Sequence, residues 1–120
     1  MNKKTLVIGA SLKEARYSNK AIRRLVKHGH EVKAIGLKKG MIDEVPIDTE
    51  LVMYKNIHTV TLYLNPKRQV SYYNYVLDLK PKRVIFNPGT ENLEFYKILK
   101  DADIEVEVAC TLVLLSTDQY

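Results

Sequence analysis

Short apolar runs alternate along the chain with segments in which apolar residues recur at helical spacing. Each run is flanked by turn-forming residues, a pattern typical of buried strands. Five such runs occur, at 5–8, 32–37, 59–64, 83–86 and 105–109. Strands joined by helices form βαβ units, and these units require a parallel sheet with right-handed crossovers. The pattern therefore predicts an α/β protein.

Capping and turn residues predict the position of the first helix. Ser18 is a candidate N-cap, and Gly29 is a good stop signal. Between them Ile22, Leu25 and Val26 lie at helical spacing, so we expect this face to pack against the sheet.

Two further helices are predicted after proline-containing turns. One follows Asn65-Pro66 and ends near Pro81, and the other begins at Thr90, which can cap it. Tyr72 and Tyr75 of the earlier helix would face outward, where they could cover a subunit interface. The faces expected to pack are Val70, Tyr73, Val76 and Leu77 in the earlier helix, and Phe95, Ile98, Leu99 and Ala102 in the later one.

Two segments do not follow the alternation. The stretch 38–58 contains Gly40 and Pro46 and has a broken apolar pattern, so no clear crossover helix is predicted there. The apolar segment 111–115 fits either a strand or a helix. The prediction is one Rossmann-like domain over residues 1–120, with about five parallel strands flanked by helices and one irregular connection.

Composition narrows the class of protein. The 120 residues are 46% hydrophobic and 28% charged, which is enough apolar material for one core and excludes a disordered chain. No stretch approaches the roughly 20 apolar residues of a membrane helix. The single cysteine, Cys110, cannot form an internal disulfide, so a reducing cytoplasm is the expected location. The formal net charge of +5 favours anionic partners.

The turn after the first strand is a candidate phosphate site. In an open parallel sheet, ligands bind beyond the carboxyl ends of the strands, where the strand order reverses. Small residues at Gly9, Ala10 and Ser11 let backbone N–H groups approach an anion, and the positive end of the next helix points there. Ser11, Arg16 and Ser18 could add side-chain donors. The alternative is a tight turn that binds nothing.

Two features distinguish between nucleotide ligands. The dinucleotide fingerprint G-x-G-x-x-G is incomplete, because Ser11 and Glu14 occupy its second and third glycine positions. Lys38 and Lys39 follow the second strand, where NAD-binding proteins place an acid. Lysines there suit a phosphorylated ribose, which disfavours NAD and leaves NADP and coenzyme A open. The alternative for both lysines is an exposed loop.

The histidines and the cysteine do not predict a metal or nucleophilic site. His28 and His30 flank Gly29 at a helix end, where a cation offsets the helix dipole. Only His58 and Cys110 remain as further ligands, and the sequence shows no base beside Cys110 to activate it. We therefore expect no metal cofactor.

Several ordered motifs give the chain a resemblance to a known family. They are V-I-G-A-S at 7–11, Arg16-Tyr17-Ser18-Asn19, T-L-Y-L-N-P at 61–66, N-P-G-T-E-N at 87–92, and Cys110 just after the last strand. This order resembles the family of small stand-alone CoA-binding domain proteins. These proteins are Rossmann-like and similar to the CoA-binding domain of the succinyl-CoA synthetase α-subunit.

The resemblance implies a coenzyme A site assembled from several turns. Segment 40–57 and the tail 111–120 depart from the family pattern, so the adenine-side wall and a role for Cys110 do not follow from it. The implied nucleotide-side residues are Gly9, Ala10, Ser11, Arg16 and Ser18. The other implied contacts are the basic loop at Lys38 and Lys39, the turn Leu64, Asn65 and Pro66, and the turn Pro88 and Gly89 with Glu91 and Asn92.

The predicted function is non-catalytic binding of coenzyme A or an acyl-CoA, because the motif turns hold no acid–base pair or activated nucleophile. An NADP-linked reductase is an alternative, although 120 residues leave little chain for a substrate pocket. A nucleic-acid-binding module is a second alternative, although a basic helix face is more often simply solvated. A homo-oligomer, or a partner enzyme that uses acyl-CoA, is compatible with the first prediction. The basic face is formed by Lys20, Arg23, Arg24 and Lys27.

Overall fold

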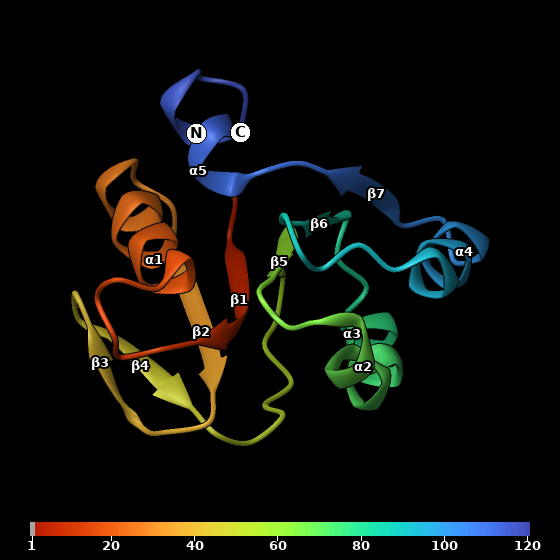
Figure 1. The fold of residues 1–120 in the computed structure, drawn as a ribbon, viewed down its shortest axis with the longest axis horizontal. Helices are drawn as coiled ribbons and strands as arrows, with labels where there is room; N and C mark the ends of the chain where they lie inside the picture. The colour runs from red at the N-terminus through yellow and green to blue at the C-terminus, as the bar shows by residue number, and fades with distance from the viewer. Residues whose placement is uncertain (1) are drawn as a thin grey trace.

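A seven-stranded, mostly parallel sheet runs through the computed structural model, which describes residues 2–120 (Figure 1). The strand order is β3-β4-β2-β1-β5-β6-β7. The strands are β1 (Thr5–Ala10), β2 (Val32–Gly36), β3 (Gly40–Ile42), β4 (Val45–Asp48), β5 (Thr59–Leu62), β6 (Arg83–Phe86) and β7 (Glu105–Val108). The helices are α1 (Tyr17–Lys27), α2 (Pro66–Gln69), the 3-10 turn η1 (Val70–Tyr72), α3 (Tyr73–Leu79), α4 (Leu93–Asp101) and α5 (Thr111–Ser116). The predicted Rossmann-like α/β class is confirmed, with seven strands where about five were expected.

Helices cover both faces of the sheet, and each face has its own apolar core (Figure 1). On one face, Ile22 of α1 and Leu115 of α5 pack in a cluster with Val7 of β1. On the other face, Phe95 of α4 packs in a cluster with Leu6 of β1. Adjacent residues of a strand point to opposite faces, so β1 supplies both cores and is buried between them.

The two additional strands form a hairpin in the segment without a predicted crossover helix. β3 pairs antiparallel with β4, and β4 adds to the sheet parallel to β2. Asp43 and Glu44 connect the two strands with positive φ angles of 45° and 67°. Positive φ at both central residues is what a tight two-residue hairpin turn requires. β3 is only three residues long and β4 contains Pro46, so neither strand shows a continuous apolar run.

Two predicted helix caps are wrong. Helix α1 has Arg16 at its N-cap, and Ser18 lies inside the first turn. Helix α4 is capped by Asn92, whose side chain accepts a hydrogen bond from the backbone N–H of Phe95. Thr90 instead donates its hydroxyl hydrogen to the carbonyl of Asn87, so it stabilises the preceding turn.

The helical segment after Pro66 packs with only part of the predicted face: Val76 is buried and Tyr73 and Leu77 pack against the core as expected, but Val70 does not. Val70 is 56% exposed, whereas Tyr75 is buried and therefore does not cover a subunit interface. The 3-10 turn η1 separates α2 from α3 and has fewer residues per turn than an α-helix. It shifts the phase of the pattern, so Tyr75, Val76 and Leu79 face the core.

The ambiguous apolar tail is helix α5, and half-buried Cys110 occupies its N-cap position. Over residues 2–120, no helix is both long enough and apolar enough to cross a lipid bilayer.

Candidate functional site

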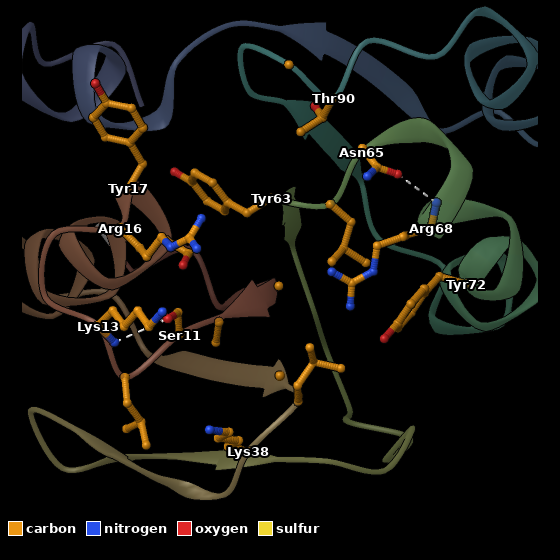
Figure 2. Close-up of a pocket in the computed structure, with 18 of the residues that line it drawn as sticks. Ser11, Lys13, Arg16, Tyr17, Lys38, Tyr63, Asn65, Arg68, Tyr72 and Thr90 are labelled. Carbon is orange, nitrogen blue, oxygen red and sulfur yellow. Dashed lines mark hydrogen bonds between the residues drawn. The ribbon is translucent and has the colours of Figure 1, made fainter.

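A cleft of about 610 Å³ opens beyond the carboxyl ends of β1, β2, β5 and β6 (Figure 2). It lies where β2 and β5 flank β1 on opposite sides, which is the point of strand-order reversal at which such sheets bind ligands. The cleft is lined by Gly9, Ala10, Ser11, Leu12, Lys13, Arg16, Tyr17, Ser18, Gly36, Leu37, Lys38, Tyr63, Leu64, Asn65, Arg68, Tyr72, Pro88, Gly89 and Thr90. Its volume is in the range of small-molecule pockets.

Gly9 fixes the floor of the cleft through its backbone conformation. Its φ is +97°, and the pairing register of β1 with β2 shifts between Ile8 and Ala10. A Cβ at this position would lie 3.0 Å from both the carbonyl carbon and the carbonyl oxygen of Tyr63. A side chain here would therefore be strained and would push apart the ends of β1 and β5.

The amino end of α1 forms one wall and has no capping side chain. Arg16 at the N-cap makes no side-chain hydrogen bond to the helix, and the first turn contains no acidic residue. Ser18 lies in this turn and lines the cleft. Uncapped N–H groups and the helix dipole together favour an anion at this position.

Hydrogen bonds hold the loop between β1 and α1 against the helix. The Asn19 side-chain amide donates to the carbonyl of Ser11 over 2.9 Å. Arg23 Nε donates to Asn19 Oδ1 over 2.8 Å, which orients that amide. Ser11 Oγ in turn accepts the backbone N–H of Lys13 at 3.2 Å. The turn that faces the cleft is therefore positioned by buried Asn19 and not only by its small residues.

The cleft carries a concentrated positive charge. Figure 2 shows Lys13 and Arg16 on one side, Arg68 on the opposite side and Lys38 on a third. No aspartate, glutamate or histidine lines the cleft. None of the four cations takes part in an ion pair within residues 2–120. The site therefore suits a ligand with several negative charges.

The wall opposite α1 is built on a buried glutamine. The Gln69 side-chain amide donates to the carbonyls of Leu64 and Thr90, each at 2.8 Å. Asn65 caps α2 by accepting the backbone N–H of Arg68 at 3.0 Å. These bonds join the turns that follow β5 and β6, so both present their backbone to the cleft.

The structure brings ten of the fourteen predicted site residues together and leaves four outside the lining. The ten are Gly9, Ala10, Ser11, Arg16, Ser18, Lys38, Leu64, Asn65, Pro88 and Gly89. Lys39 and Pro66 lie beside lining residues in sequence but do not line the cleft themselves. Glu91 accepts the backbone N–H of Gly89 at 2.8 Å, so it shapes a turn that does line it. Asn92 is buried and donates to Gln69 Oε1 over 2.9 Å, which makes it part of the supporting wall.

Several lining residues were not among the predicted site residues, and Tyr63 is the most constrained of them. Its ring lines the cleft, while its hydroxyl is buried and has no hydrogen-bond partner among residues 2–120. Burial raises the pKa of the Tyr63 hydroxyl; the nearby Thr111 hydroxyl acts in the opposite direction, and Cys110 adds to the rise. Tyr63 stands in an apolar run where an aromatic residue is equally typical of a core strand, so its residue type alone does not indicate a place in the cleft.

No group of three or more His, Cys, Asp or Glu side chains within residues 2–120 is arranged to hold a metal ion. Cys110 does not line the cleft.

The sequence of this chain matches the model of a known protein family. A model described as "CoA binding domain" matches residues 3–116. The chain belongs to this CoA binding domain family. The match covers every strand and the whole cleft, so the resemblance seen in the ordered motifs is confirmed.

Solved structures share the fold of this CoA binding domain over nearly its whole length. A crystal structure of an uncharacterized protein is 49% identical, with a TM-score of 0.97, and the alignment covers 100% of this chain and 99% of that one. A hypothetical protein from Pyrococcus horikoshii OT3 is 26% identical, with a TM-score of 0.86, covering 96% of this chain and 82% of its own. A Thermus thermophilus structure at 23% identity, with a TM-score of 0.84 and 98% and 91% coverage, supports the fold alone. Among curated proteins, none is significantly similar to this chain.

Proposed function

We propose that this CoA binding domain binds coenzyme A or an acyl-CoA in the cleft without catalysing a reaction itself. The observation that carries the proposal is the pairing of an uncapped α1 amino terminus with four cations that face no carboxylate in the cleft. Coenzyme A carries a pyrophosphate and a 3′-phosphate, so it matches a site with several separate positive groups.

The pyrophosphate is assigned to the wall formed by α1. Backbone N–H groups of Gly9, Ala10 and Ser11 and of the first helical turn would donate to its oxygens, and Arg16 and Ser18 would add side-chain donors. Charge-assisted hydrogen bonds of this kind are shorter and stronger than neutral ones. This wall therefore supplies most of the phosphate affinity.

The 3′-phosphate is assigned to the loop after β2. Lys38 lines the cleft, and Lys39 follows it in the same exposed loop. Leu12 and Leu37, respectively 44% and 75% exposed, also line the cleft. Apolar side chains held open to solvent at a cleft suit the adenine ring and the pantetheine chain, which they would shield from water.

The lining chemistry supports binding without catalysis. Acid–base and nucleophilic mechanisms need a group such as a carboxylate, histidine or activated thiol within hydrogen-bond reach of the ligand. No such group lines the cleft. An acyl-CoA bound here would be held or delivered, and a partner enzyme that uses acyl-CoA, or a second copy of the chain, is a compatible partner. A cytoplasmic location belongs to the same proposal, because coenzyme A and a free cysteine both fit a reducing compartment.

Calorimetric titration with coenzyme A, dephospho-coenzyme A, NADP and NAD tests the proposal. We expect coenzyme A to bind, and removal of its 3′-phosphate to weaken binding about tenfold, as loss of a charge-assisted contact of about 1.4 kcal/mol would do. NADP binding without coenzyme A binding would overturn the proposal and favour a reductase. Binding of a DNA or RNA duplex that depends on Lys20 and Lys27, without coenzyme A binding, would favour the nucleic-acid alternative.

A further inference from the structure

A second hollow lies at the edge of the sheet opposite the coenzyme cleft. It encloses about 500 Å³ beside the amino ends of β1, β5 and β6. The side chains that carry charge in its lining are Lys4, Lys80, Lys82 and His58, with Glu31 as the acid. The six residues of β1 separate it from the coenzyme cleft by roughly 20 Å. The two sites share no lining residue.

His58 is held in this amino-edge pocket by a buried chain of hydrogen bonds. Arg83 Nε donates to Thr59 Oγ1 over 2.8 Å, and Thr59 Oγ1 lies 2.8 Å from His58 Nδ1. Thr59 and Arg83 are both more than nine-tenths buried. Thr59 Oγ1 can either donate to His58 Nδ1 or accept from it, and protonated His58 carries a hydrogen on Nε2 in both cases. The ring thus has a fixed orientation and, when protonated, a donor on its remaining nitrogen.

Positive groups outnumber negative ones around His58, although Arg83 is itself paired with Glu107 at 2.9 Å. Burial lowers the pKa of His58, and the charges of Arg83, Lys3 and Lys82 lower it further. Glu105 acts in the opposite direction but is the smallest of these influences. An excess of positive charge therefore surrounds the ring. An anion bound in the pocket would counteract this charge and raise the pKa of His58.

The lysines of the pocket are only partly satisfied by the chain. Lys4 Nζ donates to the carbonyl of Lys55 over 2.7 Å and lies 3.7 Å from Glu31. Neither Lys80 nor Lys82 forms an ion pair within residues 2–120. Three ammonium groups against one carboxylate leave the lining positive, and two of the three keep all their donors for a ligand.

We propose that the amino-edge pocket binds a small phosphoryl anion, inorganic phosphate or a phosphate monoester, between His58 Nε2 and the ammonium groups of Lys80 and Lys82. Lys4, held by the Lys55 carbonyl, completes the positive lining. A tetrahedral dianion can accept hydrogen bonds from several convergent donors at once, which a chloride or a single carboxylate does less well. The inference is independent of the coenzyme site.

Histidine NMR on the full chain, titrated with inorganic phosphate at constant ionic strength and pH 7, tests this proposal. We expect the His58 ring signals to shift and saturate, and the pKa of His58 measured in saturating phosphate to exceed that measured in chloride. His28, exposed at the end of α1, is the internal reference and should not follow. A parallel titration with glycerol phosphate distinguishes the free anion from a phosphate monoester. The preferred ligand is the one that saturates the His58 shift at the lower concentration.

Paired variants make the test specific. Lys82→Gln should weaken phosphate binding about three- to tenfold, as loss of one charged contact would do. Lys100→Gln, an exposed position on α4, should leave the phosphate-dependent shift of His58 unchanged. The proposal is overturned if His58 and His28 respond alike and without saturation, or if Lys82→Gln has no effect. Because no coenzyme is present, failure of the coenzyme proposal would leave this result intact.

Discussion

Gly9 and Gly29 share a positive φ but differ in what surrounds them. A Cβ on Gly9 would lie 3.0 Å from the Tyr63 carbonyl group, whereas a Cβ on Gly29 would meet nothing within 4 Å. Gly29→Ala should therefore lower the free energy of unfolding only by the left-handed strain, about 1 kcal/mol. Gly9→Ala adds a steric clash and should cost at least about 1 kcal/mol more. Urea unfolding of both variants measures the difference, and equal losses would contradict the close approach of β1 and β5.

Tyr75 links stability to alkaline pH. Burial raises the pKa of Tyr75 to about 12, and its hydroxyl donates to the Val52 carbonyl. A pKa raised above the unfolded value of 10 gives stability that is complete below pH 10 and is lost as pH rises through 12. We expect the free energy of unfolding to fall by about 1–2 kcal/mol over this interval from Tyr75. Chemical unfolding of Tyr75→Phe at pH 9 and pH 11.5 should show a smaller fall, and an unchanged fall would contradict this role.

At the residue scale, the sequence indicated the site residues whose type is unusual for their position. Gly9 and Ser11 follow an apolar strand directly, and Lys38 stands where related nucleotide sites hold an acid. Arg68 and Tyr72 gave no such signal, because an arginine and a tyrosine on a helix are ordinary surface residues. Their place in the cleft depends on how α2 and η1 lie across the sheet, which is a tertiary property.

Among the elements, the wall formed by α2 and the turn before α4 depends on one buried amide network. Asn92 caps α4, donates to Gln69 Oε1 over 2.9 Å and donates to the Tyr73 hydroxyl over 2.9 Å. Asn92→Ala removes the cap and leaves Gln69 Oε1 without this donor, so it should lower the free energy of unfolding by about 2–3 kcal/mol. Thermal and urea unfolding measure that loss.

The same variant separates a supporting role from a binding role for Asn92. Because Asn92 does not line the cleft, coenzyme A affinity measured well below the melting temperature should change less than about threefold. Lys100→Gln is a control at an exposed position on the same helix and should change stability by less than about 0.5 kcal/mol. A large loss of affinity in stable Asn92→Ala protein would show that Asn92 contacts the ligand.

At the element scale, strands formed by continuous apolar runs were predictable and the strands of the hairpin were not. The apolar runs that became β1, β2, β5 and β6 were predicted because both sheet faces bury them. The hairpin of β3 and β4 was not, since its strands are stabilised by pairing with β2 and not by their own pattern. The packed face after Pro66 was predicted in part. Val76 is buried as expected, but the 3-10 turn η1 changes the number of residues per turn, so Val70 is exposed and Tyr75 is buried.

For the whole molecule, the parallel arrangement gives the two edges of the sheet different chemistry. Carboxyl ends, turns rich in small residues and the amino end of α1 meet at one edge and form the cleft proposed to bind the coenzyme. The strand beginnings meet at the opposite edge, where His58 and the lysines gather. The lining of each edge contains more cationic than anionic side chains. The sequence predicted the first edge because strand ends are marked by turn residues, whereas the lysines of the second are scattered along the chain.

The central proposal is that coenzyme A binds at the amino end of α1. The most direct measurement is calorimetric titration of coenzyme A into the wild-type protein, Arg16→Gln and Arg24→Gln. Arg16 lines the cleft, whereas Arg24 lies on the same helix, is exposed and does not line it. We predict that Arg16→Gln weakens binding at least about tenfold, as loss of a charged hydrogen bond would do, and that Arg24→Gln stays within about twofold of wild type. Equal weakening by both variants, or none by Arg16→Gln, would contradict the assignment of the ligand to this cleft.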